Sequence, residues 1–240
     1  MDGLFKILLA CPVSNNKEYI FWDWLTYIKK LTYPVDLFFV DNSPNLKFVN
    51  KISDAGYNCA HLERTADDFS RRYSIAASME FIRVAAESCN YDYLFSLECD
   101  VFPPLDIVER LLKLKNQVAG AIYFTNHGAD SQLMITRIEH PMFGPETVTR
   151  ILTTDESFLF CDGYVKQVFG CGLGCVLIHK DILKKIKFRV IDDQFTHHDV
   201  IFYNDLYNLK IPVYADTSII CKHFNSEWHK IFKYEKAIKS

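Results

Sequence analysis

Four short, almost entirely apolar runs, separated by segments with helical periodicity, constrain the fold more than any other feature of this sequence. The runs are Leu4–Cys11, Asp36–Val40, Tyr93–Leu97 and Val118–Phe124. Runs of this length without polar alternation are typical of strands that are covered on both faces, as in a parallel sheet. Strands that alternate with helices along the chain predict an α/β fold with helices flanking the sheet.

The segments between the first runs carry helix signals. Ser14 or Asn15 can cap a helix whose apolar residues recur at helical spacing up to Leu31. A longer helix is expected to begin after Asp67 or Asp68. One apolar face of this second helix is marked by Tyr73, Ala77, Phe81 and Val84.

The second half of the chain has weaker patterns. Residues 126–166 give mixed signals and are interpreted as loops with short strands. Gln167–Ile178 is punctuated by glycines and predicts a strand pair or a strand and turn. Two helices and then two short strands are expected at Lys180–Ile186, Val200–Leu209, Pro212–Ala215 and Ser218–Cys221. We therefore expect one domain over residues 1–225 and a small helical tail over residues 226–240.

The charge and composition of the chain argue against nucleic-acid binding and favour a cytoplasmic location. Lys and Arg number 27 against 30 Asp and Glu, a net charge of −3, whereas proteins that bind a phosphate backbone are usually strongly basic. We expect no nucleic-acid partner. The eight cysteines lie mostly in or beside apolar runs and are interpreted as buried thiols in a reducing compartment. No run approaches the ~18 apolar residues of a membrane span and no signal peptide is recognised, so a cytoplasmic location is expected.

The tail mixes aromatic and aliphatic residues with lysines. It could pack against the domain, which we favour, or lie on an anionic membrane surface as a peripheral contact.

Two acids directly follow the third apolar run. Glu98 and Asp100 are separated by one residue, and alternate residues of an extended segment point to the same side. Both carboxylates can therefore face one hard cation such as Mg²⁺ or Mn²⁺, which prefers oxygen ligands and often adds substrate phosphates. A surface turn with two solvated acids is the alternative.

Two other polar or glycine-rich segments suggest sites. Gly170, Gly172 and Gly174 alternate inside an apolar run, far from the position of a dinucleotide-binding fingerprint. We interpret them as places where the backbone approaches a sugar closely, or as a β-bulge. His197 and His198 point to opposite sides if the segment is extended, so at most one of them can join a given metal site.

The order of these features resembles the GT-A glycosyltransferases, in particular the large inverting group that acts on nucleotide-diphosphate sugars. The features are a strand ending in Cys11-Pro12-Val13-Ser14, a strand ending in Asp41, Glu98-Cys99-Asp100, the glycine-rich strand Phe169–Ile178, the helix start His198-Asp199, and His223 after the last strand. The resemblance extends from about Leu4 to His223.

This resemblance implies a single GT-A-type domain with a Rossmann-like, mostly parallel central sheet flanked by helices. It implies a nucleotide-binding half over about residues 1–102 and an acceptor half over about residues 103–225. The activity it implies is metal-dependent transfer of a sugar, with inversion, from a UDP- or GDP-linked donor to a glycan, lipid or protein acceptor. The implied cofactor is Mn²⁺ or Mg²⁺.

The resemblance also assigns residues to roles. Asp100 and His223 would bind the metal, and Glu98 would act on the ribose, through water or as a further ligand. Asp199 would be the general base, although the preceding residue, usually Glu in the family, is His198 here, so either could take the proton. The residues implied in binding the nucleotide sugar are Pro12, Val13, Ser14, Asp41, Arg72, Glu98 and Gly172.

Two alternative functions are open at this point. A nucleotidyltransferase on a related scaffold would carry a glycine-rich basic loop after the first strand, but Pro12–Lys17 contains no glycine. A non-catalytic nucleotide-sugar-binding module is disfavoured because both Asp100 and Asp199 are present.

Overall fold

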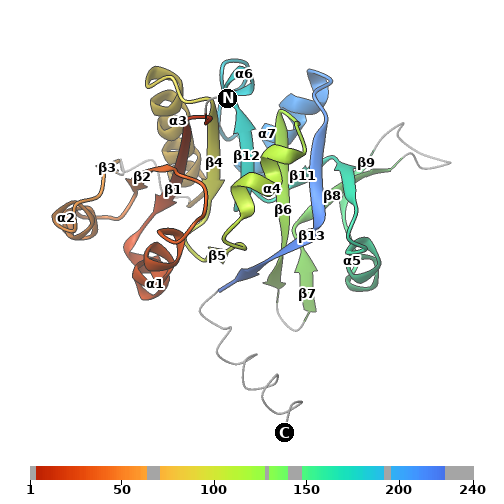
Figure 1. Cartoon of the computed structure of the whole chain (residues 1–240), viewed down its shortest axis with the longest axis horizontal. Helices are drawn as coiled ribbons and strands as arrows, with labels where there is room; N and C mark the ends of the chain where they lie inside the picture. The colour runs from red at the N-terminus through yellow and green to blue at the C-terminus, as the bar shows by residue number, and fades with distance from the viewer. Residues whose placement is uncertain (1–3, 64–70, 128–129, 140–147, 192–195, 225–240) are drawn as a thin grey trace, which may run out of the picture.

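The protein is a mixed α/β structure built on a curled ten-stranded sheet (Figure 1). The computed structural model describes residues 4–63, 71–127, 130–139, 148–191 and 196–224. The strands of the sheet are, in spatial order, β10 (Val165–Val168), β13 (Val213–His223), β6 (Val118–His127), β12 (Cys175–His179), β4 (Tyr93–Leu97), β1 (Ile7–Val13), β2 (Asp36–Asp41) and β3 (Cys59–His61). Two further strands pair at its margins, β5 (Val101–Phe102) with β13 and β7 (Asp130–Leu133) with β6.

Strand directions divide this sheet into two parts. The strands β4, β1, β2 and β3 are all parallel, so their carboxyl ends lie at one edge. The strand β12 runs antiparallel to both of its neighbours, and β13 is parallel to β6. A separate small sheet consists of β11 (Gly170–Cys171), β8 (Ile135–Glu139) and β9 (Val148–Ile151).

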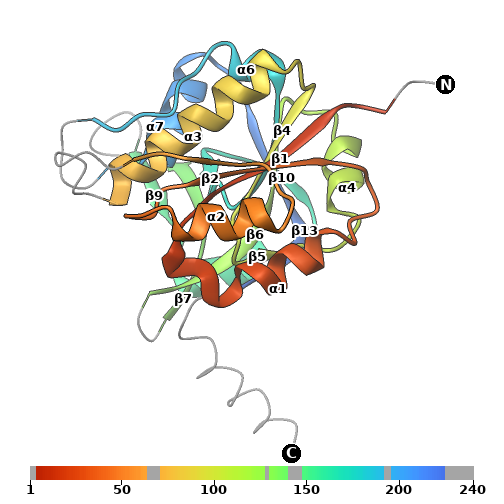
Figure 2. The same cartoon turned by 90° about the vertical axis from the view of Figure 1, so that its left-hand side faces the viewer.

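Helices cover both faces of the large sheet (Figure 2). One face carries α1 (Glu18–Ile28), α2 (Lys47–Asp54) and α4 (Ile107–Lys113), and the other carries α3 (Arg71–Ser88), α6 (Lys180–Leu183) and α7 (His198–Asn208). Alternate residues of β1 enter the two cores, with Ile7 and Leu9 in one and Leu8 and Ala10 in the other. Burial on both faces explains why the strand is apolar at every position.

The predicted α/β class is confirmed, and several of the predicted elements lie where the sequence placed them. The third apolar run is β4, and the glycine-punctuated segment contains β10, β11 and β12. All eight cysteines are free thiols, and five of them are buried, namely Cys11, Cys99, Cys171, Cys175 and Cys221. The helices of the described segments are all too short or too polar to span a lipid bilayer.

The predicted local structure differs from the observed one in three places. In residues 126–166 the expected short strands are present as β7, β8 and β9, but the helix α5 (Thr154–Phe160) was not predicted. The two short strands expected near the end form one strand, β13, with an irregular register between Asp216 and Ile220. The buried face of α3 carries Ala76, Met79, Ile82 and Ala86, whereas the apolar residues predicted to mark it are exposed.

The reversed face of α3 has a packing explanation. Small side chains such as Ala76 and Ala86 face the strands, and Phe81 instead stacks on Phe38 of β2, with ring centroids 6.1 Å apart. The proposed cap at Asp67 or Asp68 and the predicted tail lie outside the described residues.

Candidate functional site

A tight turn after β4 presents the predicted acid pair. The backbone N–H of Glu98 donates to the carbonyl of Gly174 at 3.0 Å, and the N–H of Val101 donates back to the carbonyl of Glu98 at 3.0 Å. Cys99 points into the core and is buried. The turn therefore directs the Glu98 and Asp100 carboxylates toward the same space, as the alternation of side chains predicts.

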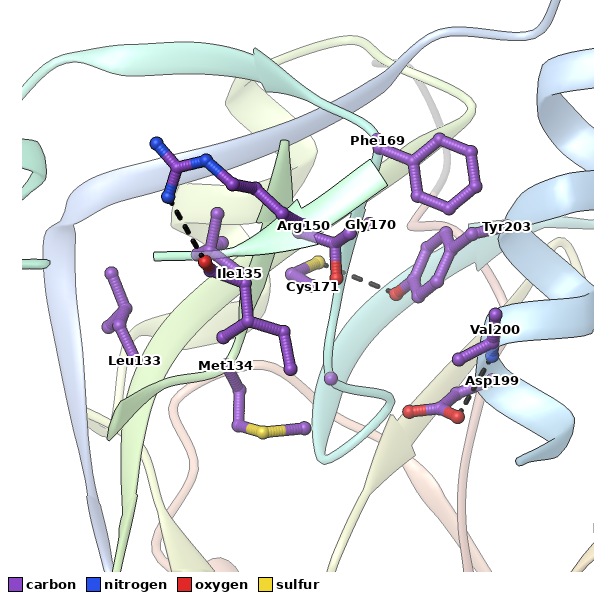
Figure 3. A pocket seen from close by; sticks show the side chains of 13 residues that line it. Leu133, Met134, Ile135, Arg150, Phe169, Gly170, Cys171, Asp199, Val200 and Tyr203 are labelled. Carbon is purple, nitrogen blue, oxygen red and sulfur yellow. Dashed lines mark hydrogen bonds between the residues drawn. The ribbon is translucent and has the colours of Figure 1, made fainter. Parts of the chain in front are cut away.

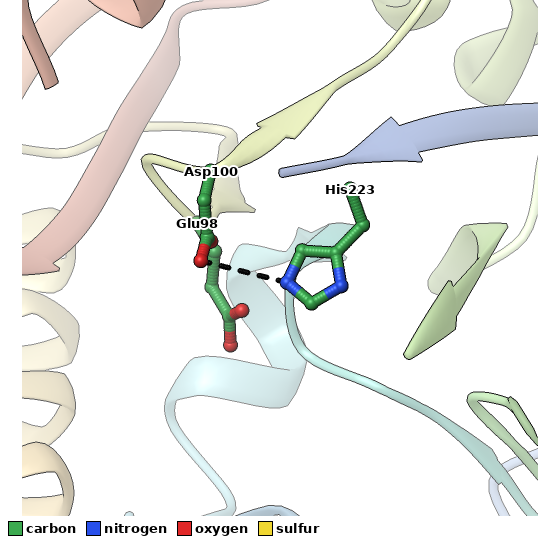
Figure 4. Close-up of side chains that lie close together, drawn as sticks. All are labelled: Glu98, Asp100 and His223. Carbon is green, nitrogen blue, oxygen red and sulfur yellow. Dashed lines mark ion pairs between the residues drawn. The ribbon is translucent and has the colours of Figure 1, made fainter. Parts of the chain in front are cut away.

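The end of β13 brings His223 to the same turn. His223 lies opposite Val101 in the antiparallel pairing of β13 with β5, and the N–H of Phe224 donates to the carbonyl of Asp100 at 2.7 Å. The His223 Nδ1 donates to the carbonyl of Phe124 at 3.1 Å, which turns Nε2 toward Asp100 Oδ2 at 3.5 Å (Figure 4). A backbone carbonyl on one side and a carboxylate on the other thus fix the imidazole.

Glu98, Asp100 and His223 form a cluster that could hold a metal ion. Each offers a ligand atom, and these atoms all lie within 4.8 Å of one another. Asp100 Oδ1 is buried and has no hydrogen-bond partner among the described residues. Two carboxylates and an imidazole suit Mn²⁺ or Mg²⁺, so the residues present fit the predicted ion.

The charges of this cluster are strongly coupled. Burial raises the pKa of Asp100, but hydrogen bonding to His223 and the charge of Lys17 outweigh it, and the net pKa is lowered. The Glu98 side chain is exposed, but protein atoms surround it on most sides. This partial loss of water, and after it the charge of Asp100, raises the pKa of Glu98 to about 7. Burial opposes protonation of His223, but Asp100 raises its pKa overall.

Lys17 is a member of the site that sequence reasoning did not single out. It closes the short helix η1 (Asn15–Lys17) after β1, and its ammonium forms an ion pair with Asp100 Oδ2. The Asp100 side chain is 1% exposed and that of Lys17 is 27% exposed. Because β1 and β4 are adjacent and parallel, a lysine just after β1 lies beside an acid just after β4. That neighbour relation is a property of the folded sheet, and no local pattern in the sequence marks Lys17.

The residues predicted to bind the nucleoside lie at the ends of β1 and β2. Pro12 and Val13 end β1, Ser14 follows, and the N–H of Asn42 donates to the carbonyl of Val13 at 2.9 Å. Asp41 ends β2 and is completely buried.

The carboxylate of Asp41 is occupied by its neighbours. Its Oδ1 accepts from the Ser43 hydroxyl at 2.5 Å, and its Oδ2 lies 2.8 Å from Nδ1 of His61. His61 ends β3 and was not predicted to belong to the site. The Asp41 carboxylate therefore reaches the surface of this corner only through the His61 imidazole, whose side chain is 14% exposed.

Arg72 and His198 lie on the α7 side of the molecule. Arg72 Nη1 donates to the carbonyl of Thr196 at 2.6 Å, just before α7 begins. The His198 ring packs edge-on against Phe188, with centroids 6.3 Å apart, and burial lowers its pKa.

Asp199, the next residue, faces the other way into a cavity of about 230 Å³ (Figure 3). The cavity lies between α7, β11 and the edge of β8, and Gly172 also lines it. The charge of Asp199 contributes to the raised pKa of Glu98, so this carboxylate and the metal cluster influence each other.

The alternating glycines make room for two tyrosines. A Cβ at Gly172 would lie 2.1 Å from the Tyr123 hydroxyl, and a Cβ at Gly170 would lie 2.4 Å from the ring of Tyr203. The N–H of Gly174 donates to the Tyr123 hydroxyl at 3.1 Å. The glycines therefore have a packing reason.

Solved glycosyltransferases share this fold. GalNAc-T7, solved with UDP, GalNAc and Mn²⁺, aligns with a TM-score of 0.62 and 10% identity over 94% of this chain and 45% of its own. The mannosyltransferase PcManGT from Pyrobaculum calidifontis, solved with GDP-Man and Mn²⁺, aligns with a TM-score of 0.60 and 10% identity over 100% of this chain and 66% of its own. Residues 1–349 of TarS from S. aureus align with a TM-score of 0.52 and 12% identity over 90% of this chain and 60% of that one.

These similarities show a GT-A-like fold, as predicted from the order of motifs. The chain spans 45–66% of the length of these three solved chains. No protein-family model matches this chain, and no curated protein matches it in sequence.

Proposed function

We propose that this protein is a metal-dependent glycosyltransferase that moves a sugar from a nucleotide-diphosphate sugar to an acceptor hydroxyl with inversion. The observation that carries the proposal is the cluster of Glu98, Asp100 and His223 at the carboxyl end of β4 in a GT-A-like fold. Open α/β sheets bind ligands at the carboxyl ends of their strands. We further propose that residues 1–102 form a nucleotide-binding half and residues 103–225 an acceptor half. The two halves meet where β13 pairs with β5.

The donor diphosphate is proposed to bind beside Asp100. Asp100 and His223 would hold Mn²⁺ or Mg²⁺, with Glu98 as a further ligand or acting through water or the ribose. When bound, such an ion neutralises the negative charge that develops on a departing diphosphate. Lys17 keeps a second positive charge at the same carboxylate. Its ammonium can turn to a phosphate oxygen once Asp100 is engaged by the ion.

The nucleoside is proposed to lie against Pro12, Val13 and Ser14 at the end of β1. Asp41 would act on the base through His61, because its own carboxylate is buried and already bonded to that ring. A histidine whose Nδ1–H donates to Asp41 presents Nε2 as an acceptor. Uracil and guanine both carry a ring N–H on the pairing edge, which fits a UDP- or GDP-linked donor.

Asp199 is the proposed general base. Its carboxylate lines the cavity, whereas the neighbouring His198 is directed toward Phe188. An acceptor hydroxyl held at Asp199 would lose its proton to that carboxylate as its oxygen attacks the sugar carbon. Arg72 and Gly172 lie on the same side of the site, and we propose that they shape the place of the donor sugar.

Nucleotide binding tests the donor site. Thermal unfolding would be followed with UDP, GDP and ADP, each with and without Mn²⁺. We expect one diphosphate to raise the melting temperature only when Mn²⁺ is present. Asp100→Asn should abolish this shift, while Asp23→Asn on the exposed surface of α1 should keep it. Stabilisation by a nucleoside triphosphate and by no diphosphate would instead indicate a nucleotidyltransferase.

Turnover tests the base. With the nucleotide identified by this shift, slow hydrolysis of nucleotide sugars that carry it, which is transfer to water, would be measured for the wild type and two variants. Asp199→Asn should reduce this transfer by at least about 100-fold, the usual scale of general base catalysis, while nucleotide binding is kept. Transfer that survives in Asp199→Asn but is lost in His198→Gln would assign the proton to the histidine. Nucleotide binding without any turnover would indicate a non-catalytic module.

A further inference from the structure

The cavity beside Asp199 is lined mostly by apolar side chains. Carbon and sulfur atoms of Met134, Ile135 and Cys171 form its floor, and Phe169 and Tyr203 form a side (Figure 3). Val200 and Ile151, which also line it, are exposed, at 40% and 49%. The cavity is therefore open to solvent and apolar within.

Several polar atoms of these walls are already used, and Thr136 adds a hydroxyl to the lining. The N–H of Phe169 donates to the carbonyl of Thr136 at 3.0 Å, and the N–H of Gly172 donates to the carbonyl of Met134 at 3.0 Å. The Tyr203 hydroxyl lies 3.5 Å from the sulfur of Cys171. The Arg150 guanidinium points away from the cavity centre (Figure 3). It bonds both carboxylate oxygens of Glu156.

Asp199 differs from the other wall residues. One of its oxygens accepts from the N–H of Val200 at 2.8 Å, which holds the carboxylate at the helix start, directed into the open space (Figure 3). A buried sugar ring carries several hydroxyls, and each needs a partner when it leaves water. Among the described lining residues, Asp199 offers a carboxylate that is directed into the space, and Thr136 adds one hydroxyl, which is few partners for a ring with several hydroxyls. This arrangement fits a molecule with a single hydroxyl on an apolar body.

We infer that the acceptor of this protein is an aryl or alkyl alcohol whose apolar body fills the cavity and whose hydroxyl reaches Asp199. This inference rests on the proposed glycosyl transfer and specifies its acceptor class. A cavity of about 230 Å³ has room for one aromatic ring and a short chain. A dry apolar cavity of about 150 Å³ already holds a benzene molecule.

The reaction of such an acceptor balances without a further reagent. The hydroxyl oxygen forms a bond to the sugar carbon, and the bond between that carbon and the diphosphate oxygen breaks. The nucleoside diphosphate leaves with the electron pair, and the hydroxyl proton passes to Asp199.

The test measures binding of two probes to the metal-free protein. Carbon-13 labelled methionine methyl groups would be followed by NMR, with Met134 as the reporter in the cavity and the buried Met79 as a reporter in the core. Met134→Leu assigns the reporter signal. Benzyl alcohol should shift the Met134 methyl saturably while leaving Met79 unchanged. Methyl α-D-glucopyranoside at the same concentration should leave both unchanged.

Large side chains at the exposed residues that line the cavity test whether the alcohol binds there. Val200→Trp and, as a second choice should that fold poorly, Ile151→Trp should weaken benzyl alcohol binding by at least about tenfold. The matched control is Ile220→Trp, an exposed position of β13 that does not line the cavity. The control should bind as the wild type does.

The outcomes separate this inference from the proposed function. A glucoside that shifts Met134 while benzyl alcohol does not would overturn the inference in favour of a sugar acceptor. The inference would also be overturned if neither probe shifted the Met134 signal. Equal binding of benzyl alcohol by the Val200→Trp or Ile151→Trp variant and the Ile220→Trp control would overturn it as well. The Mn²⁺-dependent nucleotide shift is measured independently. If that nucleotide shift is present but benzyl alcohol does not bind, only the proposed acceptor class is refuted. If the nucleotide shift is absent, the proposed transferase activity is refuted.

Discussion

Replacing Lys17 by methionine removes the one charge of the site that comes from the turn after β1 while keeping a long apolar stem. In the folded protein this ammonium contacts Asp100 Oδ2, and Nε2 of the His223 imidazole lies 3.5 Å from the same oxygen. Asp100 Oδ1 has no hydrogen-bond partner among the described residues. The variant therefore leaves a buried carboxylate with weaker compensation.

The size of the effect follows from burial. Removing one partner of a fully buried ion pair costs about 3–5 kcal/mol. The Lys17 side chain is 27% exposed and His223 stays in place, so we expect a loss of about 2 kcal/mol for the metal-free protein. For a chain of this size, each kcal/mol lowers the melting temperature by about 2–4 °C. The metal-free Lys17→Met variant should thus melt about 4–8 °C below the wild type.

Manganese should reverse much of this loss. The ammonium and a divalent ion repel each other at one carboxylate, so removing the ammonium should tighten binding of the ion by about tenfold, or about 1.4 kcal/mol. At an ion concentration of about 100 wild-type Kd values, the stabilisation would rise from about 2.7 to about 4.1 kcal/mol. The increase in melting temperature caused by Mn²⁺ should therefore be about 3–6 °C larger in the variant.

The assay is thermal unfolding in EDTA and across a manganese titration. Lys51→Met is the matched control, because Lys51 pairs with Glu18 at the surface, where such a pair contributes about 0–1 kcal/mol. An unchanged melting temperature in EDTA together with a wild-type manganese shift would refute the reasoning. It would mean that Lys17 does not compensate Asp100 at the place where the ion binds.

Three further perturbations test other parts of the structure. His61→Ala should lower the free energy of unfolding by about 1–3 kcal/mol, because it leaves an oxygen of the buried Asp41 without its partner; a double-mutant cycle with Asp41→Asn should then show coupling. Gly172→Ala should cost about 1–3 kcal/mol in denaturant unfolding, since its Cβ would overlap the Tyr123 hydroxyl. Asp92, which accepts from a backbone N–H and a lysine, has a lowered pKa, so its contribution is complete at neutral pH and is lost as the pH falls through that lowered value. Asp92→Asn should therefore lose about 1 kcal/mol at pH 7, and the loss should shrink as the pH falls through the lowered pKa.

The sequence predicts the parallel half of this fold well because burial on both faces leaves an unbroken apolar signal. The strand β4 has the predicted bounds, and the acids after it meet as strand alternation requires. His223 was placed in the site by resemblance, and the structure brings it there through the pairing of β13 with β5. Local patterns could not have predicted that contact, which joins residues 123 positions apart in the chain, from Asp100 to His223.

Other features could not be predicted because their signals depend on neighbours in space. The large apolar residues of α3 do not show which face packs, since they lie on both faces: Met79 and Ile82 are buried with Ala76 and Ala86, whereas Phe81 is exposed. Lys17 has the appearance of a solvated lysine in a polar turn. His61 shows no pattern of its own, and only the pairing of β2 with β3 brings it to Asp41.

Tyr123 connects the two halves of the site and explains why the glycine run is needed. Its ring lies 5.4 Å from the ring of His223, and its hydroxyl meets Gly172, a residue of the cavity wall, as well as the N–H of Gly174. Burial raises its pKa well above the ordinary value, and the charges of Glu98 and then Asp199 raise it further, so the hydroxyl stays neutral between two carboxylates. A neutral, closely packed ring at this place separates the charged cluster of Glu98, Asp100 and His223 from the apolar cavity. A side chain at either glycine would displace that ring toward one of them, so the glycines keep both places in shape through Tyr123.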